Sequence, residues 1–393
     1  MARIFFFRVK GYNKHMFWQK QKGKKLFVGL SSGVDSAVSA TLLQQQGYDV
    51  TGVFIRIVID GYPCTAGEDK VDAMRVAAHL RIPFFTVDLS KEYTKRVFEV
   101  SVAEFAKGRT PNPDALCNRE IKFGLFFDWC IAQGADFVAT GHYAQVENEQ
   151  GRTLLKMGAD PDKDQSYFLW AVPETKLRKT MFPVGGLAKP EVRRLARNFG
   201  LPNADRKDSQ GLCFLGPVSI DEMLHRELRL VQGDVLDEAG AVLGKHEGVQ
   251  AYTLGQRHGF ELSAQAPDTR PHFVVGKNVE RNTITVSTNK FPEHACETKI
   301  TLSDTNWIGP HHNGNYLARY RYRQKLIPAI LQRTVLCVEP QGRSFVILKE
   351  PHFVPEGQSL VLYDDTRCIG GGVILNSRYG DTDRKSRRGT GAV

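Results

Sequence analysis

Two features that define common classes of protein are missing from this 393-residue sequence. No apolar run approaches the roughly 18–20 residues that a membrane-spanning helix requires, so we expect no membrane partner. The seven cysteines are never closer than 13 residues apart, and without a CxxC pair we expect neither zinc nor an iron–sulfur cluster. An odd number of cysteines in a long chain is typical of a reducing compartment, which predicts a cytoplasmic location.

Acidic residues are missing from one end of the chain. Residues 1–25 carry eight Lys or Arg, no Asp or Glu, and no Ser, which argues against an organellar transit peptide. We interpret them as a basic extension, with Met16 as an alternative start, and residues 377–393 as a basic tail. The net charge is +10, so the body between these ends is close to neutral. A polyanion must therefore be bound there by local clusters of charge.

The N-terminal half alternates between strand-like and helical patterns. Strands are predicted over residues 26–30, 49–59, 84–89 and 136–140, and helices over 34–46, 68–80, 91–106 and 119–132. This alternation indicates an α/β domain with a parallel sheet, in which ligands bind beyond the carboxyl ends of the strands. A hairpin over 147–157 and helices over 163–172 and 188–199 follow.

The C-terminal half has a different pattern. A Gly-rich, mixed stretch from about residue 216 to 285 precedes short strands separated by turn residues, at 317–323, 334–339, 344–350, 359–363 and 370–375. These strands are typical of a small antiparallel barrel or sandwich. We therefore predict a catalytic domain over 26–217, a small central domain over 218–288 and a β-barrel over 289–376.

The stretch SSGVDS, residues 31–36, follows the first strand and opens the first helix. Its hydroxyl and backbone N–H groups at a helix N-terminus favour binding of phosphate, although simple N-capping explains the same residues. The lysine of a GKS or GKT loop is absent. Asp35 is unexpected beside phosphate unless it holds a metal ion or orients a hydroxyl. We call residues 31–36 the Ser/Gly loop.

Two cysteines stand in polar, loop-like surroundings. In GRTPNPDALCNREIKF, residues 108–123, Cys117 is predicted just before a helix whose N-terminal dipole lowers the pKa of a thiol. Asp114 is close enough to act as a general base or to position a substrate. In RKDSQGLCFLG, residues 206–216, a basic and flexible setting favours the thiolate of Cys213. For either cysteine alone, a buried structural thiol is the simpler interpretation.

Three further motifs are candidates for contact with a nucleic acid. They are ATGHY with His142, DKDQSYFL beginning at Asp162, and the alternating RYRYRQ of residues 319–324. Arg interleaved with Tyr suits contact with phosphates and stacking on bases. A structural histidine, a helix cap and a solvated edge strand are the corresponding plain alternatives.

The Ser/Gly loop resembles the pyrophosphate loop of the N-type ATP pyrophosphatases, which adenylate a substrate and release pyrophosphate. Ser32 stands where most members of that group have Gly, and a Ser fits there provided that its φ is negative. Together with GRTPNPDALCNREIKFG, ATGHYA, KDQSYFL, FPVGGLAKPEVRRLA, KDSQGLCFLG, YTLGQRHG and RYRQ, it resembles the bacterial-type tRNA-specific 2-thiouridylases over residues 26–376. That resemblance implies an ATP pyrophosphatase domain, a central domain and a tRNA-binding barrel.

The resemblance also implies roles for individual residues. ATP, with Mg²⁺, would be bound by Gly29, Leu30, Ser31, Ser32, Gly33, Val34, Asp35, Ser36, Ile55 and Gly141. The target base would be contacted by Asn112, Pro113 and Asp114, and the rest of the tRNA by His142, Lys163, Asp164, Gln165, Arg321, Tyr322 and Gln358. Cys117 would be a nucleophile and Cys213 the carrier of a persulfide, and the two would form a transient disulfide. Their Cα atoms must then approach to about 7 Å.

The activity implied is ATP-dependent 2-thiolation of the wobble uridine of tRNA, a sulfurtransferase reaction fed by a cysteine desulfurase or a sulfur-relay protein. The persulfide either attacks the base directly or first releases hydrogen sulfide, and the sequence does not distinguish these routes. Rival interpretations are another adenylating enzyme of the same superfamily and a tRNA-binding protein without catalysis. The pairing of Cys117 with Cys213 within matching motifs counts against the first, and the presence of every motif side chain except at Ser32 counts against the second. A thiolase with an iron–sulfur cluster is a further rival, and the absence of CxxC counts against it.

Overall fold

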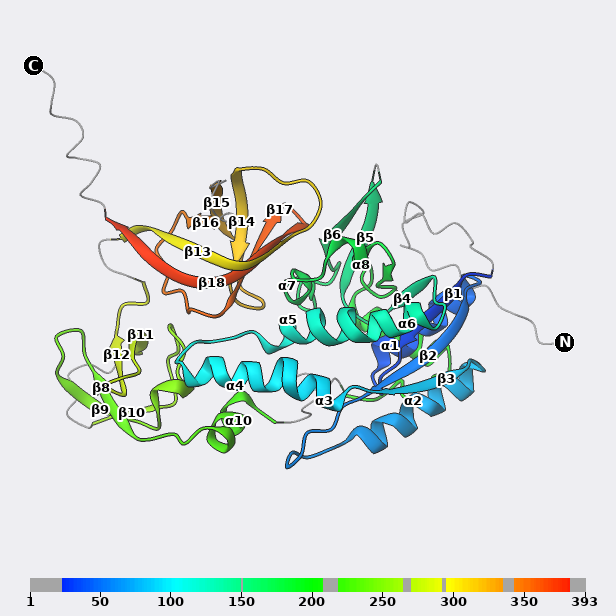
Figure 1. Cartoon of the computed structure of the whole chain (residues 1–393), viewed down its shortest axis with the longest axis horizontal. Coiled ribbons are helices and arrows are strands. Elements are labelled where there is room, and N and C mark those ends of the chain that lie inside the picture. The colour runs from blue at the N-terminus through cyan, green and yellow to red at the C-terminus, as the bar shows by residue number, and fades with distance from the viewer. Residues whose placement is uncertain are drawn as a thin grey trace, which may run out of the picture.

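The computed structural model describes residues 23–149, 151–207, 218–263, 270–291, 295–334 and 343–381. These residues form three parts that follow one another along the chain (Figure 1). An α/β part comes first, a small part with its own sheet follows, and an antiparallel barrel ends the chain. The predicted fold class is confirmed. No helix within the described ranges is long and apolar enough to cross a membrane.

The first part is built on a parallel sheet with strand order β3-β2-β1-β4-β7. Its strands are β1 (Lys25–Gly29), β2 (Asp49–Arg56), β3 (Phe84–Asp88), β4 (Phe137–Ala139) and β7 (Thr180–Met181). The chain leaves β1 toward β2 on one side and reaches β4 on the other, so the order reverses between β1 and β4. In open α/β sheets such a reversal creates a crevice at the carboxyl ends of the strands.

Helices cover both faces of this sheet. One face is covered by α1 (Val34–Gln45), α2 (Ala66–Leu80) and α9 (Lys189–Asn198), and the other by α3 (Ser90–Tyr93), η1 (Thr94–Phe98), α4 (Glu99–Ala106), α5 (Pro113–Cys117), η2 (Asn118–Phe126) and α6 (Phe127–Ala132). Leu26 and Val28 of β1 face the first group while Phe27 faces the second, as the two-residue period of a strand requires.

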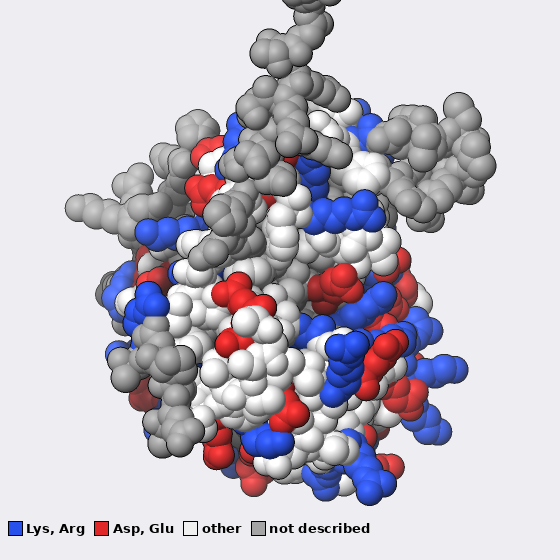
Figure 2. All heavy atoms as spheres, turned by 90° about the vertical axis from the view of Figure 1, so that its left-hand side faces the viewer, with Lys and Arg blue, Asp and Glu red and all other residues white. Residues whose placement is uncertain are grey.

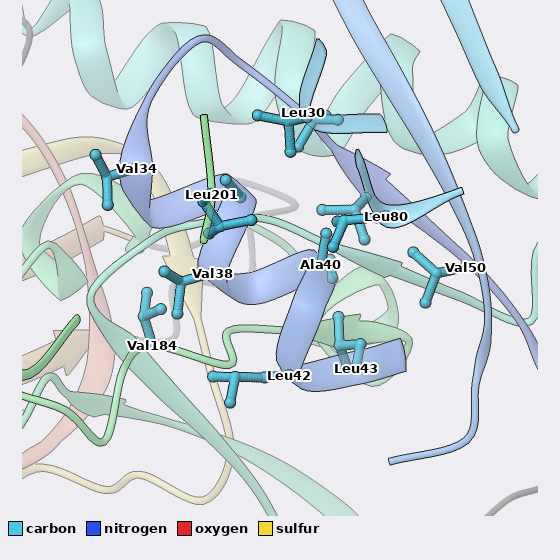
Figure 3. Close-up of a cluster of buried hydrophobic side chains, with 14 of the residues drawn as sticks. Leu30, Val34, Val38, Ala40, Leu42, Leu43, Val50, Leu80, Val184 and Leu201 are labelled. Atoms are coloured by element: carbon cyan, nitrogen blue, oxygen red, sulfur yellow. The ribbon is translucent and has the colours of Figure 1, made fainter. Parts of the chain in front are cut away.

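The helix that follows the Ser/Gly loop is buried almost all round. The small side chains of Ala37 and Ala40 let α1 lie close to the sheet, and Leu42 and Leu43 at the end of the helix join the same buried cluster (Figure 3). Val184 and Leu201, from later in the chain, close the other side of this cluster. Packing on several sides fixes the position of α1, and with it the loop at its N-terminus.

Three short helices and a hairpin connect this domain to the rest. They are α7 (Ser166–Leu169), α8 (Glu174–Leu177), α10 (Ile220–Glu227) and the hairpin β5 (Ala144–Glu149) with β6 (Arg152–Met157). The hairpin predicted over 147–157 is confirmed. The predicted helix over 163–172 is not continuous, because α7 spans only four residues and Asp164 bonds to backbone N–H groups before it.

The central part has a five-stranded sheet of order β10-β9-β8-β12-β11. Its strands are β8 (Gly233–Leu236), β9 (Val242–His246), β10 (Phe260–Leu262), β11 (Phe273–Asn278) and β12 (Thr283–Ser287), with a short helix η3 (Val249–Ala251) between β9 and β10. Val235, Val249, Val274 and Ile284 form its small core.

The last part is a closed barrel of six antiparallel strands. They are β13 (Ala295–Trp307), β14 (Gly314–Arg319), β15 (Ile327–Thr334), β16 (Arg343–Leu348), β17 (Ser359–Asp364) and β18 (Arg367–Asp381). Pairing of β13 with β18 closes the cylinder, and β18 continues five residues beyond position 376. Cys368 of β18 also pairs with Leu155 of β6, which joins the catalytic domain to the barrel wall.

One predicted barrel strand ends early. The alternation in residues 319–323 predicts a continued strand, but β14 ends at Arg319 and the chain turns. The Gln324 Oε1 atom accepts from the backbone N–H groups of Tyr320 (2.9 Å) and Arg321 (3.1 Å), and Arg323 has a positive φ of 60°. These side-chain bonds compete with the strand ladder and produce the turn.

Candidate active site

The Ser/Gly loop leaves the carboxyl end of β1 and is closed by hydrogen bonds between its own ends. The Ser36 hydroxyl lies 3.1 Å from both the backbone nitrogen and the hydroxyl of Ser31, and it donates to the Gly33 carbonyl at 3.0 Å. Gly33 is the residue before α1, so the first backbone N–H groups of the helix follow directly. A rigid loop at a helix N-terminus is a suitable site for a phosphate group.

Ser32 fits the loop without strain. Among the described residues only Arg81, Asn282, Asp304, Arg323 and Asp365 combine a side chain with a positive φ, and Ser32 is not one of them. The condition for a serine at this position is therefore met. Its carbonyl accepts from the Asn203 side chain at 2.8 Å, and the Asn203 Oδ1 atom has no hydrogen-bond partner among the described residues. That oxygen is buried.

Asp35 is neutralised by a lysine that comes from far along the chain. The Lys189 ammonium group lies 2.7 and 2.8 Å from the two carboxylate oxygens, and the Tyr143 hydroxyl donates to one of them at 2.8 Å. Lys189 is the first residue of α9 and is buried. A positive charge therefore lies beside the Ser/Gly loop although the loop sequence contains no lysine.

Glycine is required at position 141 because the turn after β4 presses against the start of α1. A Cβ atom on Gly141 would lie 2.7 Å from the Ser36 nitrogen and 2.8 Å from the Asp35 carbonyl carbon. Real Cβ atoms do not approach so closely to backbone atoms. Gly141 therefore supports the loop by close approach. Ile55, at the end of β2, is partly buried beside the core on the opposite face of the sheet.

The thiol segment, which we define as residues 108–117, differs from the sequence prediction. The helix begins at Pro113 and not after Cys117, because the Asn112 side chain caps it by accepting from the Ala115 N–H group at 3.1 Å. Cys117 lies inside this helix and is fully buried. Asp114 is in the first turn and partly exposed. The stretch after Cys117 is the π-helix η2, a form frequent at functional sites.

Cys213 lies outside the described residues, as do 208–217 around it. Arg206 lies just before this stretch. Its guanidinium group forms ion pairs with Asp69, at 2.6 Å, and with Asp72, and both carboxylates belong to α2. Arg193 donates to the Arg206 carbonyl at 2.9 Å. A pocket of about 310 Å³ lies here, lined by residues that include Arg206 and Asn203. Asn203, one of its lining residues, is bonded to the Ser/Gly loop at the Ser32 carbonyl.

Two predicted tRNA contacts are buried in this structure. His142 lies between the rings of Phe123 and Phe182 and bonds through Nδ1 to the Thr140 hydroxyl at 2.7 Å. Burial holds the pKa of His142 well below its usual range. Asp164 is 1% exposed and forms an ion pair with Arg319, itself buried. These two side chains are therefore held within the protein interior by the contacts named here.

Other predicted contacts lie nearer the surface. Gln165 accepts from the Tyr143 N–H group at 3.0 Å, and Gln358 accepts from the Tyr167 hydroxyl at 3.1 Å. The Tyr322 ring packs on that of Phe168 in a tilted arrangement, with ring centroids 4.8 Å apart. Lys163 is partly exposed. Of this group, Gln165 and Gln358 already have hydrogen-bond partners within the protein.

A basic pocket lies between the central part and the barrel. Its volume is about 530 Å³, and its lining includes Arg257, Lys290, Arg321 and the ring of Phe273 but no carboxylate. The Arg321 side chain donates to the Leu254 carbonyl, which ties the two parts together. Figure 2 faces these parts and shows basic and acidic side chains interspersed over the surface. Positive charge on this face is therefore local, as the near-neutral body predicts.

Sequence reasoning did not assign roles to Lys189, Tyr143 or Asn203 at the Ser/Gly loop. Lys189 and Tyr143 stood inside quoted motifs, GGLAKPEV and GHYA, so a signal was present. Their partners lie more than 100 residues away in sequence, and only the fold brings them together.

A loop of Ser and Gly at a helix N-terminus, at the reversal point of a parallel sheet, defines a nucleotide-binding α/β domain of the ATP pyrophosphatase type. Here it is joined to a small mixed domain and a barrel. The chain belongs to the tRNA-specific 2-thiouridylase family. It is 42% identical to the tRNA-specific 2-thiouridylase MnmA of Enterococcus faecalis, over 89% of this chain and 95% of that protein. The Nitrosomonas eutropha protein of the same name is 41% identical, over 90% and 99%.

Family models agree with the three parts. The tRNA methyl transferase HUP domain matches residues 24–217, its PRC-barrel domain 221–288, and the aminomethyltransferase beta-barrel domain 297–374. Among solved structures, a 4-thiouridine synthetase in complex with RNA and ATP aligns with 17% identity and a TM-score of 0.32, over 52% of this chain and 50% of that one. A likeness this low carries no argument about function.

Proposed function

We propose that this protein is a tRNA-uridine 2-sulfurtransferase, which uses ATP to replace the C2 oxygen of the wobble uridine with sulfur. The observation that carries the proposal is the identity of more than 40% to tRNA-specific 2-thiouridylases over nearly their whole length. The products are 2-thiouridine, AMP and pyrophosphate. The Ser/Gly loop supports the first half of this reaction, and Cys117 with Cys213 the second.

The first step is adenylation of the base. The uracil O2 atom attacks the α-phosphorus of ATP, and the bond to the β-phosphate oxygen breaks as pyrophosphate leaves with the electron pair. The Ser/Gly loop hydroxyls and the N-terminus of α1 bind the departing pyrophosphate. Lys189 offsets the charge of Asp35, so that the carboxylate does not repel the phosphates.

Magnesium arrives with the nucleotide in this scheme. No group of three His, Cys, Asp or Glu side chains among the described residues forms a metal site. Both carboxylate oxygens of Asp35 are bonded to Lys189, so Mg²⁺ would be held chiefly by the substrate phosphates and by its own waters. Bound in this way, the ion neutralises charge on the phosphates.

The second step is sulfur transfer. The terminal sulfur of a persulfide on Cys213 attacks C2 of the adenylated base, and AMP leaves with the former O2 atom. The thiolate of Cys117 then attacks the Cys213 sulfur, the sulfur–sulfur bond of the persulfide breaks, and its electron pair completes the thiocarbonyl. In the alternative route Cys117 attacks the persulfide first and releases hydrogen sulfide, which attacks C2. Both routes end in a Cys117–Cys213 disulfide, which an external thiol must reduce. Asp114 acts as the general acid or base in either route.

The tRNA would be held by the thiol segment and by surfaces of the later domains. Asn112, Pro113 and Asp114 at the start of α5 contact the target base, and Tyr322, Lys163 and the basic pocket contact neighbouring groups. The three cations of that pocket suit backbone phosphates, and its Phe273 ring suits a base. A cysteine desulfurase or a relay protein supplies the persulfide.

The test is sulfur transfer to a wobble-uridine tRNA with ATP, Mg²⁺ and a persulfide donor. We expect the wild-type protein to form 2-thiouridine. In Cys117→Ser and in Cys213→Ser, the rate of 2-thiouridine formation should fall at least about 1,000-fold, since removing a nucleophile leaves little catalysis. Cys64→Ser changes an exposed thiol and serves as the matched control. Pyrophosphate release without a thiolated base in the wild-type reaction would point to a different adenylated substrate.

A further inference from the structure

The thiol segment begins with a loop that belongs to the catalytic domain but is held by the other two. In Figure 1 this loop, between α4 and α5, lies between the barrel and the central part. The central part contributes Lys277, whose ammonium group donates to the Gly108 carbonyl at 2.9 Å and also to the Tyr252 carbonyl. It also contributes the Thr253 hydroxyl, 3.1 Å from the hydroxyl of Thr110.

The barrel holds the same loop from the other side. The Thr110 N–H group donates to the Glu356 carbonyl at 2.8 Å. A Cβ atom on Gly357 would lie 3.0 Å from the Arg109 Cβ atom and 3.2 Å from the Thr110 nitrogen, so the two backbones are in close contact. Gly357 in turn donates to the Ile374 carbonyl of β18 at 2.8 Å. Residues 108–110 are thus fixed between two domains, two residues before the Asn112 cap.

Lys277 is an unusual choice for a purely structural contact. Its ammonium group bonds to backbone carbonyls, and none of the ion pairs among the described residues includes it. Burial lowers the pKa of Lys277 to about 8, which means that the surroundings disfavour the charge. An apolar side chain of similar length would avoid this penalty. What the lysine adds is two directed hydrogen bonds that set the distance between the Gly108 and Tyr252 backbones.

Tyr252 connects this contact to the basic pocket. The turn that starts at Thr253 continues through Gly255 and Gln256 to Arg257, all of which line that pocket. The Gln256 side chain accepts from the Thr253 N–H group at 3.1 Å, and the Gly255 N–H group donates to Val274 of β11 at 2.6 Å. A ligand bound in the pocket would therefore contact the turn that begins at Thr253. Lys277 connects the residue before this turn, Tyr252, to the thiol segment.

We propose that Lys277 is a positioning residue for sulfur transfer: it holds residues 108–112, and so Asp114 and Cys117, in register with a tRNA bound to the central domain. This inference rests on the proposed function for its substrate, but the contact itself does not. Lys277 touches neither ATP nor the reacting atoms. Through Lys277, the position of the central domain determines the position of the Cys117 thiol.

Hydrogen exchange of the full-length protein tests the contact without any reaction. In Lys277→Met, amides of residues 108–117 should exchange at least about 10-fold faster than in the wild type, while those of the Ser/Gly loop stay unchanged. Lys245→Met, which changes an exposed lysine of β9 paired with Asp234, is the matched control. Equal exchange of residues 108–117 in wild type and Lys277→Met would overturn the proposal. Faster exchange throughout the chain would also overturn it, since that reports general unfolding.

Single-turnover kinetics tests the consequence. At saturating tRNA we expect Lys277→Met to form 2-thiouridine roughly 10- to 100-fold more slowly, with a tRNA Kd within about threefold of wild type. Lys277→Gln, which keeps one donor, should recover part of the rate. A normal rate at saturation with a raised Kd would make Lys277 a tRNA-binding residue and would overturn the proposal. Wild-type protein that makes no 2-thiouridine would refute the proposed function, and the exchange result would still decide the contact.

Discussion

The Ser/Gly loop and the thiol segment belong to one domain but are held in different ways. Among the described residues, the side chains that hydrogen-bond to the loop from distant segments are Tyr143, Lys189 and Asn203, and all three belong to the same domain as the loop. The thiol segment is held by Lys277 and Thr253 of the central domain and by Glu356 of the barrel. The geometry for adenylation is therefore set within one domain, whereas the geometry for sulfur transfer depends on how three domains dock.

Of the substitutions that test this comparison, Lys189→Met should have the largest effect, and it should slow adenylation alone. Without the ammonium group, the Asp35 carboxylate faces the phosphates of ATP unpaired, and one preorganised charge at a reacting phosphate is worth about 100- to 1,000-fold in rate. We expect pyrophosphate release in a single turnover to fall by that factor while tRNA binding is retained. Rapid-quench measurement of pyrophosphate and filter binding of tRNA check the two parts.

A second substitution separates repulsion from misfolding. If the unpaired carboxylate is the cause, Asp35→Asn in the Lys189→Met background should recover at least about 10-fold of the lost rate. Arg194→Met changes an exposed cation of the same helix, paired with Glu191, and should leave the rate within about threefold. No recovery in the double variant would mean that Lys189 acts directly on the nucleotide and that Asp35 is not the reason for its presence.

Gly357→Ala should have a moderate effect, and it should act on sulfur transfer and not on adenylation. Its φ of 86° favours glycine, and the added Cβ would press on Arg109 and Thr110 at the start of the thiol segment. Strain of about 1–2 kcal/mol there should slow formation of 2-thiouridine roughly 5- to 20-fold at saturating tRNA, with pyrophosphate release unchanged. The measurement is the ratio of the two single-turnover rates.

The control for this variant carries the same backbone strain elsewhere. Gly240 of the central domain has a φ of 91° and no atom within 4 Å of its Cβ position. Gly240→Ala should therefore lower the thermal midpoint without changing either rate. Loss of pyrophosphate release in Gly357→Ala would show that the barrel also supports the Ser/Gly loop, and the distinction between the two regions would then be wrong.

The same distinction explains what could be predicted from the sequence. The periodicity of residues 26–140 and the turn residues of the last third predicted the sheet, the barrel and the position of the Ser/Gly loop, because these depend on local pattern and burial. The helix start at Pro113 was missed, since Asn112 was not recognised as its cap. The inward positions of His142 and Asp164 were missed because Phe123, Phe182 and Arg319 are supplied by distant segments.

His142 allows the smallest effect to be measured, and it lies where the two regions meet. It follows Gly141, which touches the Ser/Gly loop, and its ring packs on Phe123 of η2, the helix after Cys117. Its pKa is lowered by burial, so below about pH 6.5 the unfolded chain takes up a proton that the folded protein does not. The free energy of unfolding should therefore decrease as the pH is lowered through this window, by at most about 1.4 kcal/mol per pH unit for one group.

His142→Phe removes this titration and keeps the aromatic packing, at the loss of the bond to Thr140. Thermal midpoints of wild type and variant, compared from pH 7.5 to 5.5, should differ most at neutral pH and converge as the pH falls. Burial also lowers the pKa of His246, His311 and His352, but these groups are common to both proteins and cancel in the difference. A constant difference across the range would mean that His142 takes up its proton in the folded state. The packing between the Ser/Gly loop and η2 would then accommodate a charged imidazolium group, and it would be looser than the contacts of His142 indicate.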